Sequence, residues 1–149
     1  MRAVVQRVRD CAVSVEGKVK GRIDAGLLVY LGVGRNDSHK DAVSLCDKIV
    51  NLRIFPDAQG KMNLSVRDTS GGVLVVSQFT LFGDAREGRR PSYIQAAEPA
   101  AARILYEDAL ALIQANGVPV ASGEFQASME VTYTNLGPIT ILLDTEKKF

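Results

Sequence analysis

The chain of 149 residues is long enough to bury one hydrophobic core, and we expect residues 1–149 to form a single domain. Its composition, 46% hydrophobic and 23% charged, excludes an intrinsically disordered chain, and the net charge of +1 excludes binding to nucleic acid through bulk positive charge. No apolar run reaches the roughly 20 residues of a membrane span, and charges interrupt the first ten residues. We therefore expect a cytoplasmic protein with no membrane contact.

The first third of the sequence predicts β-structure. Ala3–Val5 and Val8 begin it, and Val13 and Val15 alternate with polar residues. A turn is expected at Glu16–Lys18, and Val19 and Ile23 continue the alternation. The apolar run Gly26–Leu31 predicts a fully buried strand.

Two later segments predict amphipathic helices. The first begins at Asp37 or Ser38 and carries an apolar stripe to Leu52. The second begins near Pro99 and ends at Asn116–Gly117.

Three further segments predict strands around these helices. Val73–Val76 predicts a buried strand that runs on into Ser77–Leu81. Strict alternation predicts a strand over 124–134, then a break at 135–138 and a last strand over 139–143. Together the elements predict an α+β fold: a mixed or antiparallel, barrel-like sheet with two main helices packed on it.

The sequence contains few cysteines and histidines, the usual ligands of a structural zinc site. Its two cysteines, Cys11 and Cys46, are 35 residues apart, and His39 is its one histidine. A structural zinc site needs four ligands, so we expect no metal, and we expect no cofactor. Cys46 lies on the first helix's apolar stripe, which predicts a core thiol, and a disulfide is not expected in the cytosol. His39 lies in a charged segment and predicts a surface residue, so any catalysis has to proceed without metal or imidazole.

The residues Ser77, Gln78, Phe79 and Thr80 follow a buried strand and could form a site. Their hydroxyl, amide and backbone N–H groups are of the kind that can hold an oxyanion. Composition alone favours a plainer interpretation, in which Ser77 and Thr80 are hydrogen-bonded strand residues and Phe79 is part of the core.

Two other segments also allow two interpretations each. Gly137-Pro138 forms either an ordinary turn or a rigid unit whose carbonyls point outward with no side chain in the way. The loop with Arg86, Arg89 and Arg90 is either a solvated surface loop or a phosphate contact.

These segments resemble the D-aminoacyl-tRNA deacylase family, also called D-tyrosyl-tRNA deacylases. The resemblance is carried, in the family's order, by MRAVVQRV at the start, SQFTLFGD at 77–84, GRRPSY at 88–93 and NLGPIT at 135–140. Two small departures are Ile139, where valine is frequent, and Tyr93, where phenylalanine is frequent.

The resemblance implies an enzyme that hydrolyses the ester between a D-amino acid and the 3′-terminal adenosine of tRNA, without a metal. It implies a homodimer with both sites at the subunit interface. Gly137 and Pro138 would form a cis unit inserted into the partner's pocket, and Arg7 would hold that unit. Met129 would line the same region, and Ser77–Thr80 would form the pocket for the adenosine and the oxyanion.

The chemistry implied by the resemblance fits a site without a histidine. The ribose 2′-hydroxyl beside the ester can orient or activate water, which leaves positioning and oxyanion stabilisation to the protein, and we assign the latter to the backbone N–H groups near Phe79 and Thr80. The Thr80 hydroxyl as nucleophile is less favoured, because nothing nearby in the sequence could deprotonate it. The Gly-Pro carbonyls would exclude L-amino acids by steric conflict, and glycyl-tRNA would be cleaved.

Two alternatives belong to other classes. One is a small-molecule esterase that uses Thr80 or Ser77, and the other is a non-catalytic dimeric binding module in which the Gly-Pro loop only joins the subunits.

The distribution of charge leaves room for a local tRNA contact. Residues 1–53 carry ten Lys/Arg and six Asp/Glu (+4), residues 54–93 carry five and four (+1), and residues 94–149 carry three and seven (−4). A protein that binds only the end of a tRNA needs a local basic rim, which the first two-thirds could supply.

Overall fold

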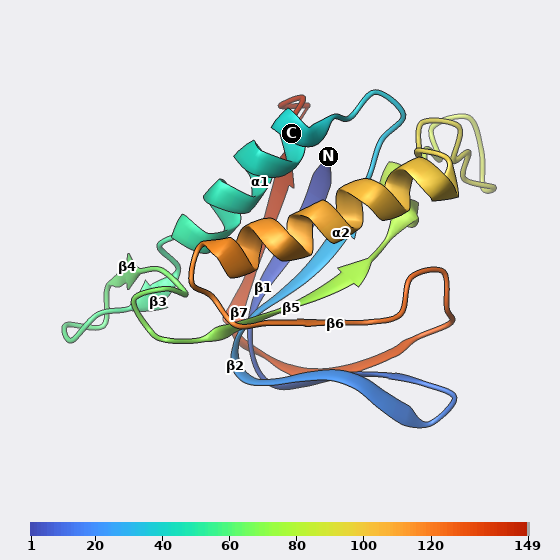
Figure 1. Ribbon diagram of the computed structural model, residues 1–149. Helices are drawn as coiled ribbons and strands as arrows, with labels where there is room; N and C mark the ends of the chain where they lie inside the picture. The colour runs from blue at the N-terminus through green and yellow to red at the C-terminus, as the bar shows by residue number, and fades with distance from the viewer. Residues whose placement is uncertain (149) are drawn as a thin grey trace.

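A mixed five-stranded sheet forms the centre of the fold, and two helices pack on one of its faces (Figure 1). The computed structural model describes residues 1–148. The strand order is β6-β5-β2-β1-β7, and a separate short hairpin pairs β3 with β4. This arrangement confirms the predicted α+β class. The strands span Arg2–Val15 (β1), Lys18–Gly32 (β2), Phe55–Pro56 (β3), Met62–Leu64 (β4), Gly72–Ser77 (β5), Val120–Ser122 (β6) and Glu130–Asp144 (β7), and the helices span His39–Asn51 (α1) and Pro99–Ala115 (α2).

The N-terminal hairpin and the first crossover explain why the sheet is mixed. β1 and β2 pair antiparallel around the predicted turn, where Glu16 and Gly17 both have positive φ. β5 then pairs parallel to β2, because α1 and the β3–β4 hairpin carry the chain back to the same end of the sheet. The buried strand expected over Gly26–Leu31 lies in β2, between β5 and β1.

The two helices begin near the predicted positions. At the start of α1, the Asp41 carboxylate accepts a hydrogen bond of 2.9 Å from the Ser38 backbone N–H, half of a capping box. α2 has Pro99 in its first turn, where the missing N–H costs nothing. Cys46 is buried in α1 as predicted, and burial raises the pKa of its thiol to about 12.

Hydrophobic residues are buried on both faces of the sheet. One cluster lies between the sheet and the helices. The opposite face carries a second cluster, because the long strands β1, β2 and β7 bend near their middles so that their two halves run in different directions (Figure 1). The buried members of this second cluster are Val8, Cys11, Val13, Ile23, Leu28, Leu74 and Val76.

The sheet is open, so the prediction of a barrel-like sheet is wrong. β6 and β7 are its two edges. Closure would require β6 to extend and pair with β7, but β6 has three residues and the chain between Ser122 and Glu130 leaves the sheet. The bend nevertheless brings β2 close to β6: a Cβ atom built on Gly21 would lie 2.5 Å from the Ser122 carbonyl oxygen.

The strand predicted over 124–134 begins only at Glu130, so the first half of that prediction is wrong. Gln126 has a positive φ, and the Ala127 N–H donates to the Glu124 carbonyl at 3.2 Å, which makes 124–127 a turn. The side chains still alternate between exposed and half-buried through this segment. Alternation of this kind reports burial, and here it arises without a strand. The break predicted at 135–138 does not end the strand, because β7 continues to Asp144.

Residues 1–148 contain neither a membrane-spanning helix nor a metal-binding cluster. Their helices lack the combination of length and hydropathy that crossing a bilayer requires. No group of three or more of their His, Cys, Asp and Glu side chains is arranged to hold a metal ion.

Candidate functional site

The segment Ser77–Thr80 lies where the main chain leaves the sheet. The Gln78 N–H donates to the Leu31 carbonyl at 2.8 Å, which extends the pairing of β5 with β2 by one residue. The chain then enters a short 3₁₀ helix, η1 (Phe79–Phe82). The segment therefore lies at the end of the buried strand, as predicted, and the interpretation of Thr80 as a hydrogen-bonded strand residue is wrong.

The turn at η1 exchanges the roles of the two phenylalanines. Phe82 is buried at 8% exposure, whereas Phe79 is 58% exposed. The interpretation of Phe79 as a core residue is wrong, because the 3₁₀ turn directs Phe82 inward in its place. Phe79 instead packs edge-on against Tyr93, with the ring centroids 5.1 Å apart.

The start of η1 has two backbone N–H groups without an acceptor among residues 1–148, next to the hydrogen-bonded side chain of Thr80. Among the residues that the structure describes, no acceptor receives the backbone N–H of Phe79 or Thr80. The first N–H groups of a helix have no partner within it, so both are available to a ligand. The Gln78 side-chain amide donates to the Thr80 hydroxyl, which ties these two side chains together.

A pocket of about 620 Å³ opens beside this segment. Ser77, Gln78 and Phe79 form one wall, and Met129 contributes to another. A concave and largely apolar pocket with a few convergent polar groups is typical of a small-molecule site. Its other lining residues are Leu31, Val33, Val76, Tyr93, Ala96, Ala97, Glu98, Pro99, Ala102, Tyr106, Phe125, Gln126, Ala127 and Val131.

Several of these pocket residues carry no signal in the sequence that marks them as site residues. Alternation predicts Phe125 on a core strand, but it lines the pocket and contacts the Tyr106 ring at 5.7 Å between centroids. Nothing local distinguishes a side chain that faces a core from one that faces a pocket. For Tyr93, the one signal is its place in the GRRPSY segment.

Gly137 and Pro138 lie in a bulge of β7. Gln6 of β1 pairs with Thr140, and Val8 pairs with Asn135, so the four residues 136–139 stand opposite the single residue Arg7. The Gly137–Pro138 peptide bond is cis, Gly137 has φ +118°, and both residues are exposed.

Side-chain amides and hydroxyls tie the base of this bulge together. The Asn135 side chain accepts a hydrogen bond from the Ile139 N–H at 3.0 Å and donates to the Thr140 hydroxyl at 3.2 Å. Gln6 of β1 donates to the same hydroxyl at 3.0 Å. The bulge is therefore a closed loop with a defined base.

Arg7 lies against this bulge. Its Nη1 donates to the Ile54 carbonyl at 2.8 Å, and its Nη2 lies 3.2 Å from the position of a Cβ built on Gly137. The structure thus brings Arg7, Gly137 and Pro138 together, and these three residues do not line the pocket of their own chain. Met129 instead lines the pocket together with Ser77, Gln78 and Phe79, whereas Thr80 is not among the lining residues.

The arginines of the 83–91 loop differ in their surroundings. Arg86 forms a two-point ion pair with Asp84, at 2.9 and 2.5 Å, and its guanidinium lowers the pKa of that carboxyl group to about 2. Arg89 and Arg90 are exposed and form no ion pair with any residue in 1–148. This loop folds back on itself through paired hydrogen bonds between Asp84 and Ser92.

Comparisons with known proteins identify relatives along the whole chain. The sequence matches the family described as D-Tyr-tRNA(Tyr) deacylase over residues 4–144. A protein of Syntrophobacter fumaroxidans named D-aminoacyl-tRNA deacylase is 58% identical, and one of the same name from Thermosipho africanus is 53% identical, each over the full length of both chains.

Solved structures show the same fold. The structure described as c-Myc DNA Unwinding Element Binding Protein superposes with a TM-score of 0.93 and 36% identity, covering 97% of this chain and 99% of that one. A probable eukaryotic D-amino acid tRNA deacylase, at 18% identity, has a TM-score of 0.80 over 95% of this chain and 97% of that one. On the match over 4–144 and the full-length identities above 50%, the chain belongs to the D-Tyr-tRNA(Tyr) deacylase family.

Proposed function

We propose that this protein hydrolyses the ester bond of D-aminoacyl-tRNA and releases free tRNA and the D-amino acid. One observation carries the proposal: the backbone N–H groups of Phe79, which lines the pocket, and of the adjacent Thr80 have no acceptor among residues 1–148, in a chain of a deacylase family. The names of the full-length relatives support it.

In the proposed reaction, the terminal adenosine and its ester occupy the pocket beside Ser77, Gln78 and Phe79. Water adds to the ester carbonyl, and the N–H groups of Phe79 and Thr80 donate to the resulting oxyanion. The bond from the carbonyl carbon to the ribose oxygen then breaks, and that oxygen takes a proton to become the free hydroxyl of the tRNA. The neighbouring 2′-hydroxyl orients the attacking water, so the protein supplies position and electrostatics.

A role of Thr80 as nucleophile has less support. Its hydroxyl oxygen accepts a hydrogen bond from the Gln78 amide, and an amide cannot take the hydroxyl proton. Glu98 is the one carboxylate among the residues that line the pocket, and no hydrogen bond joins it to Thr80. The described part of the chain therefore offers no general base in contact with this hydroxyl.

The selectivity for D-amino acids is assigned to the Gly137–Pro138 bulge of a second subunit in a homodimer. The bulge is exposed, its base is tied together, and neither of its two residues lines the pocket of its own chain, as expected of a unit that reaches into a partner. Its carbonyls would meet the side chain of an L-amino acid, whereas a D-side chain would point to solvent. Glycine has no side chain to exclude, so glycyl-tRNA is also a substrate.

The exposed arginines of the 83–91 loop are assigned to the tRNA backbone. Arg89 and Arg90 have no carboxylate partner among residues 1–148, and Arg86 retains an exposed side chain beside its pairing with Asp84. Contacts of this kind position a nucleic acid and weaken with salt.

The decisive experiment compares D-tyrosyl-, L-tyrosyl- and glycyl-tRNA as substrates of the wild-type protein in the presence of a chelator. We expect rapid hydrolysis of the D-tyrosyl and glycyl esters and very slow hydrolysis of the L-tyrosyl ester. Equal rates for the two tyrosyl esters would contradict the steric account. Hydrolysis of simple aryl esters but of no aminoacyl-tRNA would identify a general esterase, and binding of tRNA without turnover would identify a binding module.

A further inference from the structure

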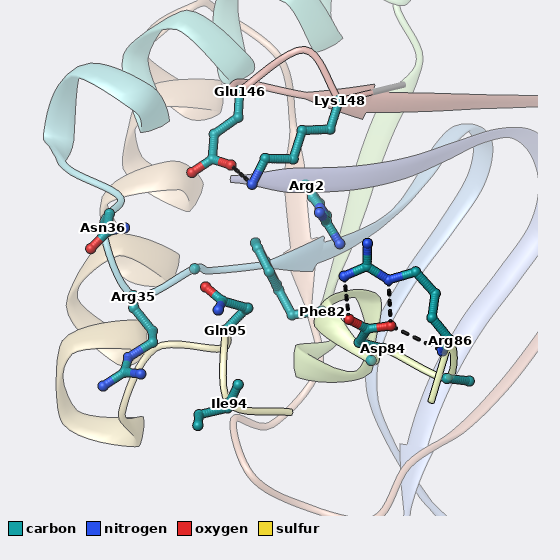
Figure 2. A pocket seen from close by; sticks show the side chains of 13 residues that line it. Arg2, Arg35, Asn36, Phe82, Asp84, Arg86, Ile94, Gln95, Glu146 and Lys148 are labelled. Carbon is teal, nitrogen blue, oxygen red and sulfur yellow. Dashed lines mark hydrogen bonds and ion pairs between the residues drawn. The ribbon is translucent and has the colours of Figure 1, made fainter. Parts of the chain in front are cut away.

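A second pocket, of about 750 Å³, has a lining of different chemical character from the first, and Figure 2 shows its side chains. Four cationic side chains line it, from Arg2, Arg35, Arg86 and Lys148, together with two carboxylates, from Asp84 and Glu146. The pocket beside Ser77–Thr80 has Glu98 and no lysine or arginine in its lining. An anion would therefore be attracted to the second pocket and not to the first.

We propose that this basic pocket binds phosphodiester groups of the tRNA 3′ strand, those that precede the terminal adenosine; the proposal rests on the function proposed above. The ligand is thus part of the same substrate, held by a second subsite.

Two segments, η1 and residues 93–94, contribute side chains to both pockets. Phe79 lines the first pocket and Phe82 lines the basic one, at opposite ends of η1. Likewise Tyr93 lines the first and Ile94 lines the basic one. Because a 3₁₀ helix rises about 2 Å per residue, Phe79 and Phe82 are offset by roughly 6 Å along the axis of η1.

Arg2 connects the basic pocket to the proposed oxyanion donors. Its Nη1 donates to the Leu81 carbonyl at 2.9 Å, its Nε lies 3.3 Å from the Asp144 carboxylate, and its guanidinium stacks 4.5 Å from the centre of the Phe82 ring. Leu81 directly follows Thr80. A strand held at Arg2 would therefore be anchored within two residues of the N–H groups that receive the oxyanion.

The other cations reach the pocket from distant parts of the sequence. Figure 2 shows Arg86 on the same side as Arg2, Lys148 from the C-terminal segment, and Arg35 on the opposite rim. Arg86 is held by Asp84 and Lys148 by Glu146, while Arg35 forms no ion pair with any residue in 1–148. Arginine binds phosphate through a planar fork of donors; the Arg86 fork already holds Asp84, whereas the Arg35 guanidinium has no carboxylate of residues 1–148 on it.

The test uses three substrates of increasing length: D-tyrosyl-adenosine, a D-tyrosyl trinucleotide ending in CCA, and full-length D-tyrosyl-tRNA. The trinucleotide adds two phosphodiesters to the adenosine. If the basic pocket binds them, most of the gain in kcat/KM appears between the first two substrates. A gain that appears only with full-length tRNA would overturn the assignment of the pocket to the single-stranded end.

The double variant Arg35→Gln/Lys148→Gln tests the side chains. We expect it to raise KM for the trinucleotide and for full-length tRNA by about 3- to 30-fold, with little change in kcat, because phosphate contacts act on binding. The dependence of log(kcat/KM) on log[salt] should become shallower by about 0.7 for each phosphate that the variant no longer binds.

The double variant Arg22→Gln/Lys61→Gln is the matched control. It removes one arginine and one lysine that are exposed and lie outside the basic pocket, so the change in net charge is the same. Equal kinetics and equal salt slopes for the two double variants would overturn the proposal. Failure of the wild type to hydrolyse even D-tyrosyl-adenosine and D-tyrosyl-tRNA would instead overturn the proposed function, so the two failures are distinguishable.

Discussion

At the level of single residues, the candidate site depends on backbone groups more than on reactive side chains. The N–H groups of Phe79 and Thr80 are unpaired among residues 1–148, while the Thr80 hydroxyl is engaged with the Gln78 side chain. A substitution that changes a side chain but keeps the backbone separates these two contributions.

The variant Thr80→Val therefore tests whether the hydroxyl takes part in the chemistry. We expect kcat on D-tyrosyl-tRNA to fall less than about tenfold, well short of the roughly 10²–10³ typical when an oxyanion donor is removed. Single-turnover hydrolysis gives the rate directly. Loss of all activity in a folded Thr80→Val protein, or a trapped acyl-enzyme in the wild type, would favour the nucleophile.

Gly137 is a second position to test, because the addition of a single Cβ atom would crowd its neighbours. Its φ of +118° is unfavourable for other residues, and a Cβ atom there would lie 2.7 Å from the Ile139 side chain and 3.2 Å from Arg7 Nη2. We expect Gly137→Ala to distort the bulge and to reduce discrimination between D- and L-tyrosyl-tRNA. The ratio of the two deacylation rates is the measurement.

Gly17→Ala provides the control for that substitution. Gly17 also has a positive φ, but a Cβ there would meet nothing within 4 Å. The substitution should lower stability by about 1 kcal/mol through backbone strain while leaving the D/L ratio as in the wild type. Equal effects of the two variants on the D/L ratio would show that strain alone, and not the bulge, is responsible.

At the level of elements, α2 is tied to the strand that carries the site. The Tyr106 hydroxyl of α2 donates to the buried Val75 carbonyl of β5 at 2.9 Å, two residues before Ser77. Burial raises the pKa of this phenol to about 12 from its ordinary 10.0. The hydroxyl thus remains a donor in the folded protein at pH values where the unfolded chain ionises.

The variant Tyr106→Phe should lower the free energy of unfolding by about 0.5–1.5 kcal/mol at pH 7, measured with urea. The pH dependence has a definite sign. Because the folded pKa lies above the unfolded one, this residue's contribution is fully present below pH 10 and decreases as pH rises from about 10 to 12. The wild type should therefore lose its advantage over Tyr106→Phe across that interval, and an advantage that grows there would contradict the assignment.

At the level of the complete fold, the proposed site is divided between two parts of the chain that lie apart. The pocket is built around the end of β5 and includes Val131 at the start of β7, whereas Gly137 and Pro138, farther along β7, are not among its lining residues. A single chain therefore holds each half of the proposed site without joining them.

We expect the protein to form a homodimer in which each bulge completes the partner's pocket. Sedimentation equilibrium should give about twice the chain's mass of 16.1 kDa. Chains that combine Gly137→Ala with an intact pocket, mixed with chains whose pocket is inactivated, should regain D/L discrimination in the mixed dimers. A monomer with full discrimination would contradict the division of the site between subunits.

Local patterns in the sequence are enough to predict the elements whose burial is periodic. The β1–β2 hairpin, the buried part of β2, α1 and α2 are recognisable in this way, because turn residues and apolar spacing act locally. The Ser77–Thr80 segment is different: composition alone favours ordinary strand residues there, and only the resemblance to the deacylase family marks it as a site.

Other features became visible only when distant parts of the chain were brought together. These are the open sheet, the departure of residues 124–129 from it, and the four residues of β7 that stand opposite Arg7. The basic pocket, whose lining comes from five separate parts of the sequence, is another feature of this kind. The physical reason is that strand pairing, closure and pocket walls join residues far apart in the chain, whereas local periodicity reports only which side chains are buried.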